Sequence, residues 1–185
     1  MSELKEKIEE AVNKHLNTAI ALSKDLAEHP ELPYQEFESS RKMAEILKEA
    51  GFEVTYPYAG YNTAYCAKLD NGDGPSVALL AEYDALPEIG HGCGHNLFGA
   101  TSSLAAAALK SVIDEVGGEV RLYGTPGEEG GENGSAKGSF VREGYFKDVD
   151  AALSAHPGVG HRLTEKTLGC VPIDIEFWGK ASHAA

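Results

Sequence analysis

The sequence predicts an α/β fold in which a mixed sheet is flanked by helices. The chain opens with a long amphipathic pattern of helical period, and short apolar segments typical of strands recur after it, separated by helical or turn segments. At 185 residues and 42% hydrophobic composition, it is long enough for one globular domain and part of another. This alternation favours a sheet that is buried between helices.

Two helices are predicted before the first strand. Residues 3–28 carry apolar side chains at helical spacing between charged positions: Ile8, Val12, Leu16, Ile20 and Ala27. The two prolines in residues 29–33 end this pattern, and a second helix follows that is marked by Phe37, Met43 and Leu47. Gly51 is well placed to end it, because glycine readily adopts the left-handed conformation found after many helices.

The remaining predicted elements are mostly strands. Apolar stretches typical of strands lie at residues 52–56, 63–69, 77–81, 120–123 and 151–155. A helix of small residues is expected between the third and fourth stretches, from about residue 97 to residue 112. Residues 171–178 alternate between apolar and polar side chains, which predicts a half-exposed strand.

The chain is acidic, with a formal net charge of −13 and an isoelectric point near 4.9. No nucleic-acid or membrane partner is expected, because phosphate groups favour a basic face. No apolar run approaches the roughly 20 residues of a membrane span, and residues 1–6 do not resemble a signal peptide, so a cytoplasmic location is expected. The three cysteines, Cys66, Cys93 and Cys170, are odd in number and scattered, which does not indicate a disulfide framework.

A glycine-rich segment, residues 90–96, places Cys93 and His95 two positions apart. A thiolate and an imidazole at this spacing are able to bind one metal ion or a close pair, and the glycines leave room for the ion. The alternative is a buried cysteine in a turn beside a capping histidine. His91 is a further candidate, either as a ligand or as a residue that faces the substrate.

Two further strand ends carry residue types that bind metals. Glu128 and Glu129 follow the strand at 120–123, so one is able to bind an ion while the other acts as a base. His156 ends the strand at 151–155. Each has an ordinary alternative when taken alone, as acidic loop residues or a structural histidine. Ligands bind at the carboxyl ends of strands in open α/β sheets, so three such ends together predict a metal site.

Asp84 lies at the end of the strand at 77–81. Its carboxylate is predicted to orient a metal-bound histidine, although a turn-forming aspartate is equally consistent with the position. The glycine-rich residues 130–138 have some likeness to a phosphate-binding loop. Nucleotide binding is not expected there, because three nearby glutamates would repel phosphate groups.

Several motifs occur in an order that resembles one enzyme family: residues 29–32 and 35–37, Tyr83-Asp84-Ala85-Leu86-Pro87, His91-Gly92-Cys93-Gly94-His95-Asn96, Glu128-Glu129-Gly130 and residues 179–185. Together they resemble the peptidase M20 family of dinuclear metallopeptidases, which are of the aminoacylase and carboxypeptidase type. Within it, the sequence is similar to the amidohydrolase branch that contains p-aminobenzoyl-glutamate hydrolase and β-alanyl-lysine-type dipeptidases. The resemblance extends over essentially the whole chain.

The resemblance implies a hydrolase that uses two divalent metal ions, zinc, manganese or cobalt, on a small N-acyl amino acid or dipeptide. The implied metal ligands are Cys93, His95, Glu129 and His156. Glu128 is implied as the base that takes a proton from a metal-held water, which then attacks the amide carbonyl. Asp84 matches a carboxylate that supports the ligands in this family.

The chain departs from the family pattern in two respects. Glu82 stands where many relatives carry a metal-binding histidine, and Cys93 is expected to compensate. Relatives also continue into a lid and dimerisation domain and then return to the catalytic sheet, where they supply one more histidine ligand. Residues 1–166 are therefore expected to be the first segment of the catalytic domain, and residues 167–185 the beginning of the lid.

His183 matches a lid histidine that reaches into the partner subunit's site, so a homodimer is expected in the full-length form. The main alternative is a truncated fragment without catalytic activity that retains only partial metal binding.

Overall fold

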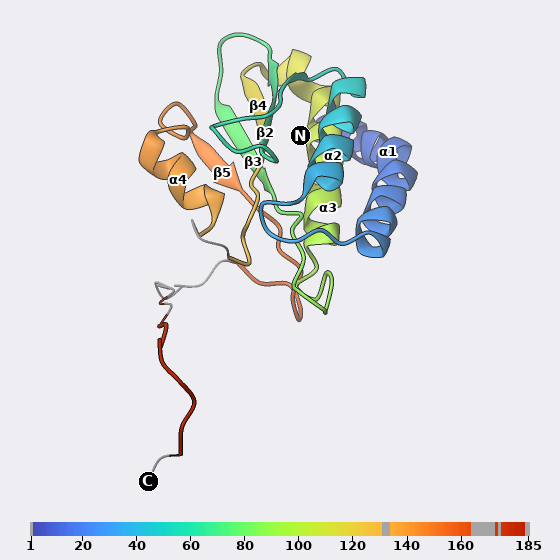
Figure 1. Ribbon diagram of the computed structural model, residues 1–185. Helices are drawn as coiled ribbons and strands as arrows, with labels where there is room; N and C mark the ends of the chain where they lie inside the picture. The colour runs from blue at the N-terminus through green and yellow to red at the C-terminus, as the bar shows by residue number, and fades with distance from the viewer. Residues whose placement is uncertain (1, 131–133, 164–172, 174, 184–185) are drawn as a thin grey trace.

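The computed structural model describes residues 2–130, 134–163, 173 and 175–183. It confirms the predicted fold class, because the five strands form one mixed sheet. Figure 1 shows helices on both sides of this sheet. The elements follow the order α1 (Ser2–Glu28), α2 (Phe37–Glu49), β1 (Glu53–Thr55), β2 (Tyr65–Asp70), β3 (Ser76–Ala81), α3 (His95–Val116), β4 (Glu119–Gly124), α4 (Ala136–Glu143) and β5 (Ala151–Leu153). None of the described helices is both long and apolar enough to span a membrane.

The strands lie in the order β1-β2-β4-β3-β5. β3 is parallel to β4 and to β5, whereas the β1–β2 and β2–β4 pairs are antiparallel. Leu79, in the middle of β3, is level with Leu122 of β4 and with Leu153 of β5. Since β3, β4 and β5 run in the same direction, the segments that follow them emerge at the same edge of the sheet.

Alternate residues of the central strands face two separate cores. Tyr65 of β2 and Leu122 of β4 lie in the larger core, which also contains side chains of α1, α2 and α3. Their neighbours Cys66 and Tyr123 lie in a second core with Phe140 of α4. Figure 1 shows the same division, with α1, α2 and α3 grouped on one side and α4 on the other. The sheet is therefore covered on both faces, as predicted.

Helix α4 lies within a glycine-rich region for which the sequence predicts no helix. Gly138 lowers its helical propensity, but Phe140 is fully buried and packs edge-on against Tyr123. Gly144, at φ +90°, ends the helix. Burial of an aromatic side chain, worth about 1.5–3 kcal/mol, outweighs the local cost of one glycine.

The predicted strand at residues 171–178 is not formed by its described members. Ile173, Ile175, Phe177 and Trp178 are all exposed and belong to no strand. An alternating pattern gives a strand only where a neighbouring strand accepts its hydrogen bonds and a core takes its apolar face, and these side chains have neither. The prediction is wrong for these residues. The predicted boundary between residues 166 and 167 lies outside the described residues.

Candidate metal centre

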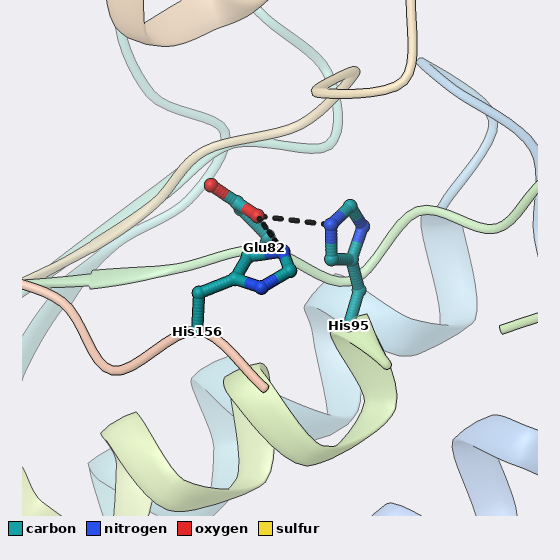
Figure 2. Close-up of side chains that lie close together, drawn as sticks. All are labelled: Glu82, His95 and His156. Carbon is teal, nitrogen blue, oxygen red and sulfur yellow. Dashed lines mark ion pairs between the residues drawn. The ribbon is translucent and has the colours of Figure 1, made fainter. Parts of the chain in front are cut away.

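Three side chains from separate elements meet at the edge where β3 and β5 end. Glu82 directly follows β3, His95 is the first residue of α3, and His156 lies shortly after β5. Figure 2 shows them pointing towards one another. His95 Nε2 is 3.0 Å from Glu82 Oε2, and His156 Nε2 is 3.9 Å from the same oxygen. Ligand atoms around a tetrahedral zinc ion are about 3.3–3.6 Å apart, since each lies about 2.0–2.2 Å from the metal.

A second group shares His95. Its Nε2 is 3.8 Å from Glu128 Oε2 and 3.9 Å from Glu129 Oε1. In each of the two groups, the candidate ligand atoms all lie within 4.8 Å of one another. The residues that follow β3, β4 and β5 thus approach one imidazole nitrogen, as expected from the common direction of these strands.

Asp84 fixes the orientation of the His95 ring. Its Oδ1 is 3.1 Å from His95 Nδ1, and its backbone oxygen is 3.0 Å from the same nitrogen. Asp84 Oδ2 also accepts a hydrogen bond from the backbone N–H of Glu129 at 2.8 Å. A carboxylate that holds one ring nitrogen leaves the other directed at the cluster, which is the usual arrangement of a metal-binding histidine.

Three buried atoms of the cluster have no hydrogen-bond partner among the described residues: His95 Nε2, Glu82 Oε2 and Glu129 Oε1. An unpaired buried polar atom costs about 1–3 kcal/mol, and such atoms are few in native proteins. One divalent cation or a close pair would satisfy all three. The residues present therefore fit a metal centre.

The charges of the cluster affect both an imidazole and a carboxyl group. Burial lowers the pKa of His95, but the carboxylates of Asp84 and Glu82 raise it to about 10 overall. Burial, with a smaller contribution from Glu82, raises the pKa of Glu128. A metal ion at His95 has to displace a proton, and Glu128 is made a better proton acceptor.

The loop that carries Glu128 and Glu129 is held by a second buried carboxylate. Glu36 Oε1 accepts a hydrogen bond from the backbone N–H of Gly127 at 2.9 Å, and its Oε2 accepts one from Thr63 Oγ1 at 2.8 Å. Gly127 has φ +67°, and a Cβ atom there would overlap the ring of Tyr34. Only glycine combines this conformation with this close contact.

Cys93 and His183, also expected at the site, lie outside the clustered atoms. Cys93 is exposed, and a hydrogen bond with Glu129 raises the pKa of its thiol to about 11. It therefore lies beside an expected ligand without joining either group of ligand atoms. His183 is exposed in the C-terminal segment, which leads away from the sheet in Figure 1.

The structure adds two residues to which the sequence assigns no role in the site. Lys137, in the first turn of α4, binds Glu82 Oε1. The sequence contains a signal for Glu82 as a site residue, because Glu82 follows a strand and lies two positions before Asp84. It contains no such signal for Lys137, because the position of Lys137 depends on a helix that the local sequence does not indicate.

The profile of peptidase family M20/M25/M40 matches residues 78–184, more than half of the chain. The chain belongs to this family. The matched range begins in β3 and includes every residue of the two ligand groups. The resemblance read from the sequence motifs is thereby confirmed.

Two curated relatives match all or nearly all of the chain but are themselves much longer. One component of the p-aminobenzoyl-glutamate hydrolase of Escherichia coli (strain K12) is 38% identical over 205 residues, which cover 100% of this chain and 42% of that protein. The Xaa-Arg dipeptidase of Mus musculus is 30% identical, with 98% of this chain and 44% of that protein covered. The chain thus spans less than half the length of these curated relatives.

A dinuclear metal-binding peptidase of the M20 family from Bacillus subtilis has a similar structure. Its TM-score is 0.62 at 29% identity, and the match covers 74% of this chain and 41% of that chain.

Proposed function

We propose that this M20 chain provides the metal-binding part of an enzyme that hydrolyses an amide or peptide bond in a small N-acyl amino acid or dipeptide. The observation that carries the proposal is the set of unpaired buried ligand atoms around His95. The names of the relatives support the substrate class, because one denotes a hydrolase of p-aminobenzoyl-glutamate and another a dipeptidase.

In the complete enzyme, Cys93, His95, Glu129 and His156 would hold two divalent ions of zinc, manganese or cobalt. When bound, such ions polarise the substrate carbonyl and make a water acidic enough to ionise near neutral pH. Asp84 orients His95 through Nδ1 and holds the backbone of Glu129. The buried carboxylate of Asp84 thus fixes the position of His95 relative to Glu129.

Glu128 takes the proton of the attacking water and returns it to the leaving amine. Its carboxylate lies 3.8 Å from His95 Nε2, so it faces the ligand cluster. Burial raises its pKa above the usual range, which brings a carboxylate base closer to the pH at which it must both accept and release a proton.

His183 acts in the partner subunit's site of a cytoplasmic homodimer.

A second candidate is a fragment with partial metal binding and no activity. It is favoured by the position of Cys93 outside the ligand groups.

An activity assay distinguishes the two candidates. It compares the 185-residue chain with a version extended to the length of the relatives. Both are incubated with zinc, manganese or cobalt and with p-aminobenzoyl-glutamate or an Xaa-Arg dipeptide, and release of the amine is measured. Metal-dependent release by the extended version supports the proposed function. If the extended version binds metal but cleaves no N-acyl amino acid or dipeptide, the proposed function is wrong.

A further inference from the structure

The two carboxylate oxygens of Glu82 have different surroundings. The side chain is only 5% exposed, Oε1 is bound by Lys137 Nζ, and Oε2 has no hydrogen-bond partner among the described residues. A buried ionised oxygen is costly unless a cation or a donor reaches it. Lys137 satisfies one oxygen of the pair, and either a metal ion or a protonated histidine would satisfy the other.

Glu82 Oε2 lies between two imidazole rings (Figure 2). The rings of His95 and His156 are perpendicular, with centroids 5.4 Å apart, and both Nε2 atoms are within 3.9 Å of this oxygen. His95 Nδ1 is already held by Asp84. Its Nε2 is therefore the nitrogen left for an ion, and Glu82 Oε2 is the oxygen nearest to complete that ion's coordination.

We propose that Glu82 is itself a metal ligand, binding an ion together with His95 and His156 through Oε2, and that Lys137 restricts it to that one oxygen. The inference rests on the proposed function, because it requires that the centre binds divalent ions. A carboxylate with both oxygens available is able to bind a metal through either or both. Because Lys137 occupies Oε1, only Oε2 remains for the metal. Hydrogen-bonded partners commonly orient metal ligands in this way. It is a positioning residue.

The same contacts have a purely structural alternative, in which Glu82 and Lys137 only join the end of β3 to α4. In that alternative the partner of Oε2 is a protonated His95, whose Nε2 lies 3.0 Å away. The structural alternative makes a different prediction, since removing a structural ion pair lowers stability without changing the ligand set of the metal.

Titration of the 185-residue chain with cobalt(II), in competition with a chelator, distinguishes the two, because the visible spectrum of cobalt reports the geometry and type of its ligands. The variants are Glu82→Gln and Lys137→Met. Glu119→Gln is the matched control: Glu119 is also a buried carboxylate, it binds Lys68 and Arg121, and it lies at the opposite end of the parallel strands.

We expect Glu82→Gln to weaken cobalt binding at least 10-fold and to alter the spectrum. Lys137→Met should weaken binding about 10-fold, the lower end of the range for the loss of a partner to a ligand, and Lys137→Arg should restore it. Glu119→Gln should bind cobalt as the parent does.

A folded Glu82→Gln variant with the parent's affinity and spectrum would overturn the inference and leave the proposed function intact. If Glu82→Gln does not fold, Lys137→Met decides the matter, and an unchanged affinity and spectrum in that variant overturns the inference. A parent chain that binds no divalent ion overturns both the inference and the proposed function.

Discussion

One imidazole, His95, is held by one carboxylate and faced by three others. Asp84 fixes its Nδ1, while Oε2 of Glu82, Oε2 of Glu128 and Oε1 of Glu129 lie within 3.9 Å of its Nε2. Because these carboxylates are negatively charged, they favour a positive charge at His95 Nε2. Two of these carboxylates, those of Asp84 and Glu82, raise the pKa of His95 to about 10 despite its burial.

The two adjacent glutamates are expected to respond differently to the same substitution. In a version extended to the length of the relatives, Glu128→Gln should retain its metal and lose about 100–10,000-fold in turnover, because an amide cannot accept a proton. Glu129→Gln should lose both, because an amide neither neutralises nor holds the cation well. Metal content and turnover are to be measured on the same preparations. The assignment is reversed if Glu128→Gln loses metal while Glu129→Gln keeps it.

Alkylation tests Cys93 as a ligand, with Cys66 as an internal control. The thiolate is the reacting species, and the pKa of both thiols is raised to about 11, in Cys93 by Glu129 and in Cys66 by burial. Reaction of the exposed Cys93 should therefore speed up about tenfold per pH unit between pH 7 and 9, while the buried Cys66 stays slow. Zinc should protect Cys93. Equal labelling of Cys93 with and without zinc, measured by peptide mass spectrometry, would rule out a metal–thiolate bond.

Among the elements, the loop after β4 is the one that most directly positions the centre. Gly127 is held at φ +67° beneath the ring of Tyr34, and its N–H is bound by Glu36. These contacts join the two glutamates to the segment before α2. Displacement of the loop would therefore move Glu128 and Glu129 together.

Substitution of Gly127 tests this arrangement. Gly127→Ala should destabilise the chain by about 2–4 kcal/mol, because it combines an unfavourable backbone conformation with overlap of Tyr34. Gly72→Ala is the control, since Gly72 also has a positive φ, +82°, but a Cβ atom there would meet no atom within 4 Å. It should cost about 1 kcal/mol. Urea unfolding measures both, and equal losses would show that the contact with Tyr34 does not hold the loop.

The elements also show what the sequence was able to predict. Apolar stretches with polar residues at their ends predict the strand positions. They also predict the common edge of the sheet at which Asp84, Glu129 and His156 lie. They do not predict helix α4, because its stability comes from the burial of Phe140 against distant aromatic residues. The partnership of Lys137 with Glu82 is hidden for the same reason, since it depends on where α4 packs.

At the scale of the whole molecule, the chain spans 42% of the first curated relative. Several large apolar side chains are exposed, among them Leu153 of β5 at 55% and Val159 at 95%. Exposed apolar surface of this kind favours association.

We expect the purified 185-residue chain to be nearly inactive and to self-associate. Its turnover should lie far below the roughly 1–1000 per second typical of enzymes, and sedimentation should show species larger than a monomer. Turnover in the typical range by a monomeric chain would contradict this expectation and show that the additional length of the relatives is dispensable.

Metal content after dialysis is the most direct test of a metal centre built around His95. The parent chain, Cys93→Ala, His95→Ala and the control His29→Ala, which changes a histidine with 66% side-chain exposure, are loaded with zinc or manganese, dialysed and analysed for metal. We expect the parent and His29→Ala to retain the metal, and Cys93→Ala and His95→Ala to lose most of it. Retention of as much metal by His95→Ala as by the parent would rule out a metal centre built around His95.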